Sequence, residues 1–411
     1  MTDTVSGPAA ATRTGRREYD LLDPEFYRSN PHDAWAWMRA NEPVYRDSRN
    51  GIWGITKHAD IQEVERLSSI FVSGMGYRVN WSPDEINMIA QDNPRHQQQR
   101  HLVQPHLTRK GIEPRLPGVK SLVTELLDAI DAAGSSDVEI VHTLSGQLPA
   151  RTTCRILGFP EDMWPQLKSW SERLMRTDMM HRDGPTFAEF MDANIEFMTA
   201  AGGLAPQKLE AAAKGCPMDD FMTIWLTQPI DGECLAPNAV MHEIGLFIAG
   251  GAETTRTAIS HGLRAFADHP DQWDAMAADP GLVPDAVEEV LRWVTPLNNM
   301  FRRAVVDHEV RGVTIRRGDR LALLYPAANR DEDVFENPNA FDIRRNPNPQ
   351  IAFGFGTHLC VGANFARASL EMVFGEMSRR YLAPKVLTEP DVEPNIFARA
   401  VRSFRVGLAP R

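Results

Sequence analysis

The chain has 411 residues, 43% of them hydrophobic, which is enough for a sizeable core, and its formal net charge at pH 7 is −11. The acidic balance argues against a nucleic-acid partner. No apolar run approaches the roughly 18 residues that span a bilayer, and the start lacks the apolar core of a signal peptide. We therefore expect a cytoplasmic protein without a membrane anchor.

The N-terminal region predicts a tail followed by short elements. Residues 1–17 are rich in Thr, Ala, Gly and Arg and lack periodicity, which predicts a disordered tail before a single domain over residues 18–411. Residues 71–93 are irregular and mixed in polarity, which is typical of a functional loop. Between them we predict a helix over 31–42, a hairpin over 43–56 and a helix over 58–67.

The rest of the chain is mostly helical in pattern. Helical periodicity dominates residues 96–269, with breaks at Pro160, 184–185 and 215–217. The remaining predicted elements are a helix over 284–294, short strands over 305–306, 313–315 and 321–324, a coiled segment over 329–349, and a helix over 363–381. The predicted fold class is mainly α with a small β subdomain.

Cys360 lies in the run FGFGTHLCVG, with Gly354 and Gly356 before it and Gly362 after it. Such glycines indicate a backbone that turns tightly or approaches something flat. Its position before a predicted helix favours a thiolate, which is a metal ligand or a nucleophile. The alternative is a small buried hydrophobe, the usual role of a free cysteine. The four cysteines show no spacing typical of a zinc ribbon or a disulfide framework.

A second unusual pattern lies inside the apolar segment that begins at Pro237. Its middle holds Gly250, Gly251, Glu253 and Thr254. Each glycine inside a helix costs about 1 kcal/mol relative to alanine, and burying an acid in an apolar helix is also costly. From these residues alone, close helix packing with Glu253 in solvent explains the pattern as well as a functional site does.

Together these motifs resemble the cytochrome P450 family over almost everything from about Tyr19 to Leu408, and the resemblance implies the cytochrome P450 fold. It implies that Cys360 is the axial thiolate ligand of haem b. It also implies that Thr254 and Glu253 pass protons to bound dioxygen. The other haem-binding residues that it implies are His96, Arg100, Arg302, His358, Phe353, Gly354 and Gly251, with Arg303 a rival to Arg302 for a propionate. Glu289, Arg292 and Arg330 match the family's structural lock.

The implied function is that of a soluble bacterial monooxygenase. It would insert one oxygen atom from O2 into a steroid, a sterol side chain or a terpenoid. Electrons would come from a ferredoxin and its NAD(P)H-dependent reductase, because the chain has no nucleotide-binding glycine motif of its own. A basic docking surface is expected at Arg109, Lys110, Arg344, Arg345 and Arg367. The implied substrate pocket contains Met75, Tyr77, Ile244, Phe247, Ile248, Leu297, Asn298, Asn299, Met300 and Phe397.

Three alternatives remain at this point. A peroxygenase of the same fold would use hydrogen peroxide, and a haem-binding sensor would have no turnover. The intact pair of Glu253 and Thr254 argues against both. A hydrolase with Cys360 as nucleophile would need a general base, for which His358 is close in sequence.

Overall fold

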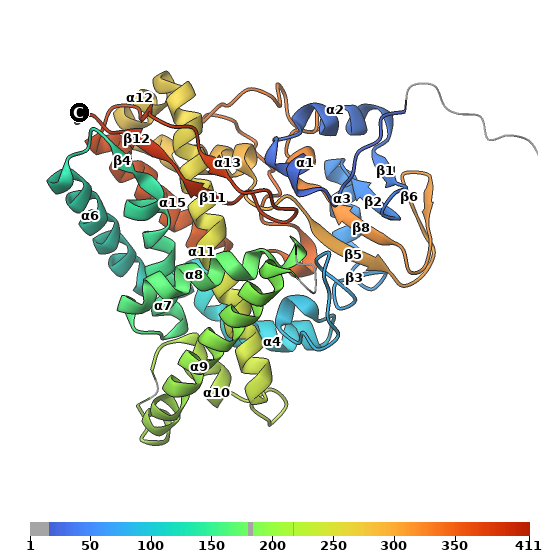
Figure 1. Cartoon of the computed structure of the whole chain (residues 1–411), viewed down its shortest axis with the longest axis horizontal. Coiled ribbons are helices and arrows are strands. Elements are labelled where there is room, and N and C mark those ends of the chain that lie inside the picture. The colour runs from blue at the N-terminus through green and yellow to red at the C-terminus, as the bar shows by residue number, and fades with distance from the viewer. Residues whose placement is uncertain (1–15, 180–183, 217) are drawn as a thin grey trace, which may run out of the picture.

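The computed structural model describes residues 16–179, 184–216 and 218–411. Residues 1–15 of the predicted tail lie outside these ranges, so its disorder stays a prediction. Helices make up most of the molecule, and the largest sheet lies to one side of them (Figure 1). This arrangement confirms the predicted fold class of a mainly α protein with a small β part.

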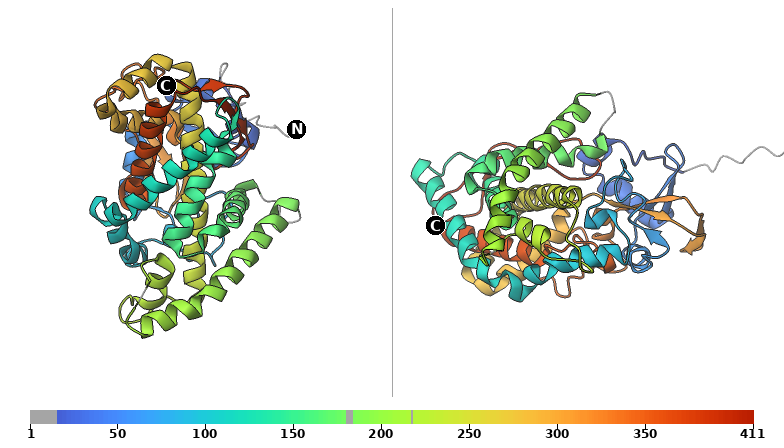
Figure 2. Two further views of the ribbon diagram at one scale, coloured as in Figure 1. Left: turned by 90° about the vertical axis from the view of Figure 1, so that its left-hand side faces the viewer. Right: turned by 90° about the horizontal axis from the view of Figure 1, so that it is seen from below.

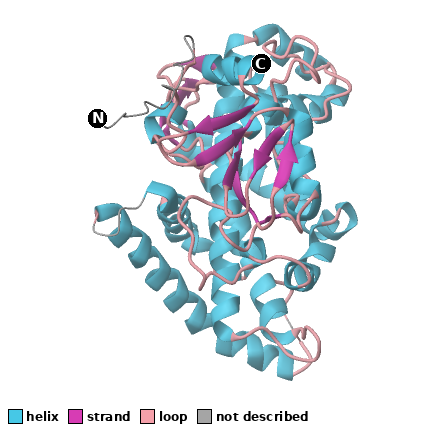
Figure 3. Ribbon diagram, turned by 90° about the vertical axis from the view of Figure 1, so that its right-hand side faces the viewer, coloured by secondary structure: helices cyan, strands magenta, loops and turns pink. Residues whose placement is uncertain are grey.

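The largest sheet, seen in Figure 3, joins three strands from residues 44–72 with two from residues 300–323. β1 (Val44–Asp47) and β2 (Ile52–Ile55) form the predicted hairpin, and β2 runs parallel to β8 (Arg320–Leu323). On its other edge β8 pairs with β5 (Met300–Ala304), which in turn pairs with β3 (Phe71–Val72). The irregular loop that follows β3 therefore starts beside β5.

One predicted strand is wrong. Residues 305–306 are not a strand, because β5 ends at Ala304 and Val306 is 48% exposed. The strand instead contains Arg302 and Arg303, since β8 and β3 supply hydrogen-bonding partners on both of its edges. The smaller sheets are β4 (Val138–Glu139) with β12 (Arg405–Gly407) and β9 (Lys385–Val386), β6 (His308–Val310) with β7 (Val313–Ile315), and β10 (Asp391–Val392) with β11 (Val401–Ser403).

The helices surround α11 (Pro237–Asp268), a helix of 32 residues that runs through the middle of the molecule (Figures 1 and 2). None of the helices within the described ranges is long and apolar enough to cross a membrane. The helices that pack against the large sheet include α1 (Pro24–Arg28), α2 (His32–Asn41), α3 (His58–Arg66) and α14 (Tyr325–Ala328). The others are α4 (Arg95–Val103), α5 (Arg109–Ile112), α6 (Leu116–Ala133), α7 (Gln147–Leu157), α8 (Trp164–Met175), α9 (Pro185–Ala213), α10 (Phe221–Thr227), α12 (Pro270–Ala278), α13 (Val283–Val294) and α15 (Ala363–Arg380).

Two hydrophobic clusters fix α11 in place. The half that begins at Pro237 buries Ile244 and Ile248 among the residues of α7 to α10, and the later half buries Leu263 against α13 and α15. A Cβ atom at Gly262 would lie 2.6 Å from the ring of Phe374 on α15, so the two helices approach closely there. Because the Cys360 loop leads directly into α15, this contact sets the distance between that loop and α11.

Candidate active site

A large cavity lies between the middle of α11 and the loop that carries Cys360. Its volume is about 1030 Å³, and its walls come from the loop after β3, from α4, α7, α8, α9 and α11, and from the Cys360 loop. Apolar side chains such as Leu174, Phe190, Met198 and Phe247 dominate the wall. A cavity of this size and lining suits a hydrophobic small molecule.

Backbone geometry explains the glycines before Cys360. Gly354 and Gly356 have φ angles of 72° and 67°, in the left-handed region that favours glycine. A Cβ atom at Gly356 would also lie 2.7 Å from the carbonyl oxygen of Glu65. The N–H of Cys360 donates to the carbonyl of Phe353 at 2.9 Å and closes the turn. The loop is thus held against α3, and the side chain of Cys360 faces the cavity.

The protonation of Cys360 depends on more than the helix behind it. Its side chain is open to the cavity but lies deep within the protein. Burial raises the pKa of the Cys360 thiol and outweighs the lowering by the N–H of Gly362 and the guanidinium groups of Arg100 and Arg367. The protein groups around Cys360 thus favour the thiol, and coordination to a metal ion would favour the thiolate, because a coordinating thiol is deprotonated.

Four of the predicted haem-binding side chains meet at the cavity from separate elements. His96 and Arg100 come from α4, Arg302 from β5 and His358 from the Cys360 loop. The rings of His96 and His358 have centroids 4.0 Å apart. Nη2 of Arg302 donates to Oε1 of Glu65 at 3.2 Å, which steadies the guanidinium. The structure also places Phe353, Gly354 and Gly251 on the cavity wall.

The structure distinguishes Arg302 from its rival. Arg303 is half-buried, and its Nε donates to the carbonyl of Gly318 at 3.3 Å, away from the cavity. Arg302 is 3% exposed and lines the cavity. Adjacent residues of a strand point to opposite faces, so only one of the two arginines can face the cavity. The geometry favours Arg302 as the residue that meets a propionate.

The polar groups on the wall fit the anionic edge of a haem. Among the described residues, the side chain of Arg100 has no hydrogen-bond or ion-pair partner, and Nδ1 of His358 is buried without one. Burial lowers the pKa of the Arg100 guanidinium. Buried polar groups normally have partners, so these two call for a ligand that accepts hydrogen bonds. Propionates meet this need, and Cys360 faces the same cavity.

Thr254 and Glu253 are neighbours on α11 but face different surroundings. The hydroxyl of Thr254 donates to the carbonyl of Gly250 at 2.8 Å, and the side chain lines the cavity. A Cβ atom at Gly251 would lie 2.8 Å from Oγ1 of Thr153, so this glycine lets α7 approach α11. Glu253 is 1% exposed and points away from the cavity. Its predicted relay role therefore involves groups behind the wall.

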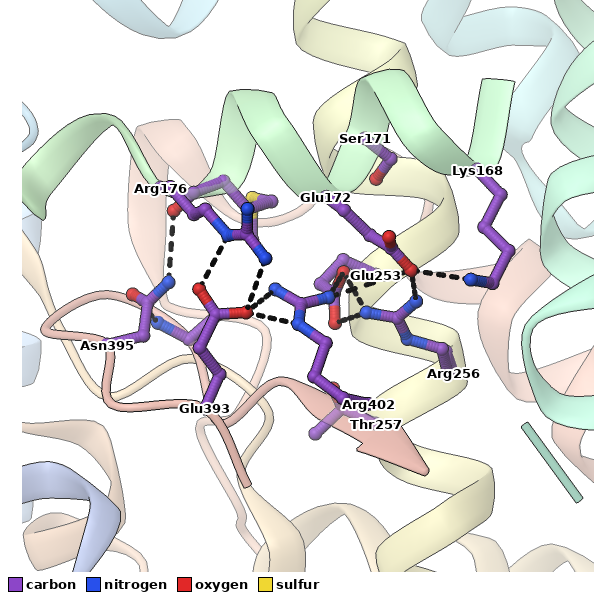
Figure 4. A network of polar contacts seen from close by, with 12 residues as sticks. Lys168, Ser171, Glu172, Arg176, Glu253, Arg256, Thr257, Glu393, Asn395 and Arg402 are labelled. Atoms are coloured by element: carbon purple, nitrogen blue, oxygen red, sulfur yellow. Dashed lines mark hydrogen bonds and ion pairs between the residues drawn. The ribbon is translucent and has the colours of Figure 1, made fainter. Parts of the chain in front are cut away.

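A network of charges surrounds Glu253 (Figure 4). Its carboxylate forms ion pairs with Arg256, one helical turn further along α11, and at 3.4 Å with Arg402 of β11. Beyond them, Glu172 contacts Arg256 and accepts from Nζ of Lys168 at 2.6 Å. The branch through Arg402 continues to Glu393 and to Arg176, whose Nε donates at 2.7 Å. Lys168 and Arg176 are partly exposed, so the network leads from Glu253 to the surface.

The predicted structural lock forms, but with a different third member. Glu289 and Arg292 are fully buried and joined by two hydrogen bonds of 2.7 Å. Arg345, rather than Arg330, completes the contact, with its Nε donating to Glu289 at 3.2 Å. Arg330 instead stacks on Trp293, with its guanidinium carbon 3.8 Å from the ring centre. The coiled segment folds back so that its far end, not its start, reaches Glu289.

The structure divides the predicted substrate-pocket residues into three groups. Five of them line the cavity, namely Tyr77, Phe247, Leu297, Met300 and Phe397. Ile244 and Ile248 are buried in the core between helices, and Met75 is 41% exposed on the loop. Asn298 and Asn299 are buried away from the cavity, where their amides donate to the carbonyl of Ile396 at 3.2 and 2.9 Å. Those amides therefore stabilise the backbone near Phe397.

The sequence analysis predicted Tyr77 but missed the other polar cavity residues of the loop after β3, namely Arg78, Glu85 and Asn87. The hydroxyl of Tyr77 donates to Glu85 at 2.5 Å, and Arg78 and Asn87 lie on the same wall. The only signal was that the loop is long and mixed in polarity. Glu65 was also missed, because a glutamate within a short amphipathic helix gives no sign of being buried.

A buried glutamate fastens this loop to α11. Glu243 accepts from the N–H of Met88 at 2.8 Å and from Nε2 of Gln99 at 3.1 Å. Burial raises its pKa to about 8, against the lowering by the Met88 N–H and by Arg95. Met88 belongs to the single turn of helix in the loop and Gln99 to α4, so one carboxyl group joins three segments around the cavity.

Comparisons with known proteins agree with this geometry. Residues 177–397 match the cytochrome P450 family. A steroid C26-monooxygenase of Mycobacterium tuberculosis is 34% identical over 96% of this chain and 98% of its own length, and a linalool 8-monooxygenase of Pseudomonas putida is 29% identical over 95% and 99%. A Mycobacterium marinum cytochrome P450 solved with pseudoionone has a TM-score of 0.85 and 30% identity, covering 96% of this chain and 100% of its own.

The fold, the cysteine loop and these similarities together place the chain in the cytochrome P450 family. It is a bacterial monooxygenase of the oxidoreductase class. Members of this family hold haem iron through a cysteine thiolate and use O2, a redox partner and a hydrophobic substrate.

Proposed function

We propose that this protein hydroxylates a steroid, a sterol side chain or a terpenoid with O2, and that Cys360 is the axial ligand of haem b. The observation that carries the proposal is one cavity of about 1030 Å³ whose wall includes Cys360, Thr254 and a largely apolar lining. The relatives that share its whole length are named for steroid and linalool oxidation. When bound, thiolate-held haem supplies the activation of O2 for insertion into a C–H bond.

In this proposal the residues of the wall position the haem edge. Arg100 and Arg302 supply guanidinium donors, and His96 and His358 lie beside them. Arg302 is already oriented by Glu65, while Arg100 keeps its donors available. Charge-assisted hydrogen bonds are roughly twice as strong as neutral ones, so these residues contribute both affinity and orientation.

Proton delivery uses Thr254 and the network behind it. The Thr254 hydroxyl can turn from the Gly250 carbonyl toward a group in the cavity, because a hydroxyl both donates and accepts. Glu253 would pass protons toward the cavity by leaving its ion pairs with Arg256 and Arg402, because a carboxyl group exchanges its proton whereas a guanidinium group keeps its own. This requires the Glu253 carboxylate to loosen its ion pairs, so the network would control when protons arrive.

We further propose that the protein is cytoplasmic and that its electrons come from a ferredoxin and an NAD(P)H-dependent ferredoxin reductase. The docking surface differs from the one expected from sequence. Arg109, Lys110 and Arg344 are exposed, and α5, which holds the first two, packs against α15 behind Cys360. Arg345 is bound to Glu289, and Arg367 donates to Glu288 at 2.5 Å, so they contribute less free charge.

The ferrous–carbon monoxide difference spectrum of the purified protein, beside Cys360→Ala, tests the cofactor and its ligand. We expect the strongly red-shifted Soret band of thiolate-bound haem in the wild type and its loss in the variant. Incubation with steroid and terpenoid panels plus NAD(P)H, ferredoxin and reductase should then give hydroxylated products. A protein without haem, or a variant that keeps the band, would contradict the assignment of Cys360.

A further inference from the structure

Arg78 is a buried arginine on the cavity wall whose N–H donors have few good hydrogen-bond acceptors. It is 7% exposed, and it belongs to the loop after β3. Its Nη2 lies 3.5 Å from the carbonyl of Met175, at the limit of a hydrogen bond, and its Nε lies 3.4 Å from Oδ2 of Asp178. Nε makes no hydrogen bond within the described part of the chain. Good charged hydrogen bonds are about 2.7–2.9 Å long, so these contacts are weak.

Arg292 shows what a satisfied buried arginine looks like in the same molecule. Its guanidinium makes hydrogen bonds of 2.7–2.9 Å to Glu289 and to backbone carbonyls, and the side chain is fully buried away from the cavity. A guanidinium has five N–H donors, and leaving them unpaired in the interior is costly. The lack of good acceptors for the Arg78 guanidinium therefore indicates that a ligand in the cavity supplies one.

The surroundings hold the Arg78 guanidinium in place. Its carbon lies 4.0 Å from the ring centre of Phe397, which also lines the cavity. The backbone is fixed to the sheet, because Nη2 of Arg320 donates to the carbonyl of Arg78 at 3.2 Å and the N–H of Phe301 donates to that of Tyr77 at 2.8 Å. A donor held in this way loses little entropy when a ligand binds.

The charge of the site favours a neutral acceptor over an anion. Asp178 is fully buried beside Arg78, and the pair carries no net charge when the carboxyl group is ionised. A carboxylate ligand would desolvate next to Asp178 and be repelled by it, whereas a carbonyl oxygen accepts from Arg78 without adding charge. Glu85 on the same loop also lines the cavity and adds to this preference.

We infer that Arg78 donates a hydrogen bond to a carbonyl oxygen of the substrate, which is therefore a hydrophobic ketone. This rests on the proposed function and narrows it, because steroids and terpenoids occur as ketones, alcohols and hydrocarbons. Arg78 is a residue that determines specificity. It selects the ketone and fixes its orientation, while the apolar wall binds the carbon skeleton.

Binding of matched ligands to the holoenzyme tests the inference. The pairs are 5α-androstan-3-one with 5α-androstane and menthone with p-menthane, with androstane-3-carboxylate as the anionic probe. Dissociation constants come from the Soret spin-state shift. For at least one pair we expect the ketone to bind the wild type about tenfold or more tightly than the hydrocarbon, as a charged hydrogen bond predicts, and the carboxylate to bind more weakly than the ketone.

Arg78→Met should remove the preference for the ketone while leaving hydrocarbon binding and haem content unchanged. Because this change leaves the buried Asp178 carboxylate without its ion-pair partner, the double variant Arg78→Met/Asp178→Asn tests the same loss without that carboxylate. Asp178→Asn alone should improve binding of the carboxylate. Arg28→Met is the matched control, since it removes an exposed guanidinium that lies on α1 outside the cavity and should keep the preference.

The possible results distinguish a failure of the Arg78 assignment from a failure of the proposed function. Equal binding of ketone and hydrocarbon to the wild type, or a preference that survives in both Arg78 variants, overturns the role of Arg78 and leaves the proposed function standing. Loss of haem from these variants also overturns it, because Arg78 would then hold the cofactor. If no ligand of either pair binds the wild type, the proposed substrate class fails and the Arg78 assignment fails with it.

Discussion

At the scale of single residues, helix geometry gives Thr254 and Glu253 separate tasks. Successive side chains on an α-helix are rotated by about 100°, so two adjacent residues can face different surroundings. Thr254 faces the cavity, whereas Glu253 is enclosed by Arg256 and Arg402. The two residues can cooperate only if the Glu253 carboxyl group leaves these ion pairs and turns toward the cavity, because the guanidinium groups keep their own protons.

Replacing Thr254 tests its part in proton delivery. Thr254→Ala removes the hydroxyl that donates to the Gly250 carbonyl beside the cavity, so we expect NAD(P)H consumption to continue while product per NAD(P)H falls by about tenfold, within the usual range for a lost proton-transfer group. Thr254→Ser keeps a hydroxyl and should retain most of the coupling. The ratio of product to NAD(P)H oxidised, with hydrogen peroxide assayed in parallel, measures the effect. Unchanged coupling in Thr254→Ala would rule out the relay.

Two of the three residues of the structural lock could be predicted from the sequence. Glu289 and Arg292 were predictable as a pair because an i, i+3 spacing places both on one face of a helix. Their third partner was not, because Arg330 and Arg345 both lie in a segment without periodicity. The path of that segment decides which arginine arrives, and the structure brings Arg345 to Glu289.

At the scale of elements, the loop after β3 is held in place by α11. Glu243 accepts from Met88 in the loop and from Gln99 on α4, and Nδ1 of His242 accepts from the N–H of Ile86 at 3.0 Å. These contacts fix a segment that has little regular structure of its own. They hold the later part of the loop against α11, while hydrogen bonds from Phe301 and Arg320 hold its earlier part around Arg78.

Glu243 also gives this contact a predictable pH dependence. Its pKa is raised to about 8 in the folded protein, against about 4.3 when unfolded. Between these values the folded state holds a proton that the unfolded state has lost, so the free energy of unfolding falls as pH rises, by up to about 1.4 kcal/mol per pH unit. Glu243→Gln should remove this contribution and gain stability relative to the wild type from pH 5 to pH 8.

Urea unfolding of the holoenzyme across that pH range measures this difference. The exposed Glu113→Gln is the control and should follow the wild type at each pH. Parallel pH profiles for the wild type and Glu243→Gln would contradict a protonated Glu243.

At the scale of the whole molecule, the site lies where the helical and strand-bearing parts meet. The haem-binding candidates come from α4, β5 and the Cys360 loop, and the substrate side of the cavity adds the loop after β3, α8, α9 and α11. Helix α5, which packs against α15 behind Cys360, carries the exposed cations Arg109 and Lys110 on a molecule of net charge −11. Such a local patch can attract an acidic redox partner despite the overall charge.

Charge reversal tests this docking surface. Arg109→Glu should slow electron transfer from ferredoxin by about threefold or more at low ionic strength, because charges at the rim of an interface mainly affect the association rate. The difference should shrink as salt screens the charges. Arg28→Glu, on α1 beside the large sheet, is the control. Stopped-flow reduction rates at several salt concentrations measure both variants, and identical rates for Arg109→Glu and the wild type would exclude this surface.

The sequence by itself determined the local chemistry of this protein. Three features could be predicted from the sequence, because each depends on neighbours along the chain. They are the glycine-rich turn around Cys360, the interrupted apolar helix at Thr254 and the mainly helical fold class. Only the tertiary structure decided which side chains share the cavity. In the folded protein Glu253 lies in a network of ion pairs, Asn298 and Asn299 donate hydrogen bonds to backbone carbonyls, and Arg78 lines the cavity. The physical reason is that burial and pairing depend on segments distant in sequence, which no local pattern specifies.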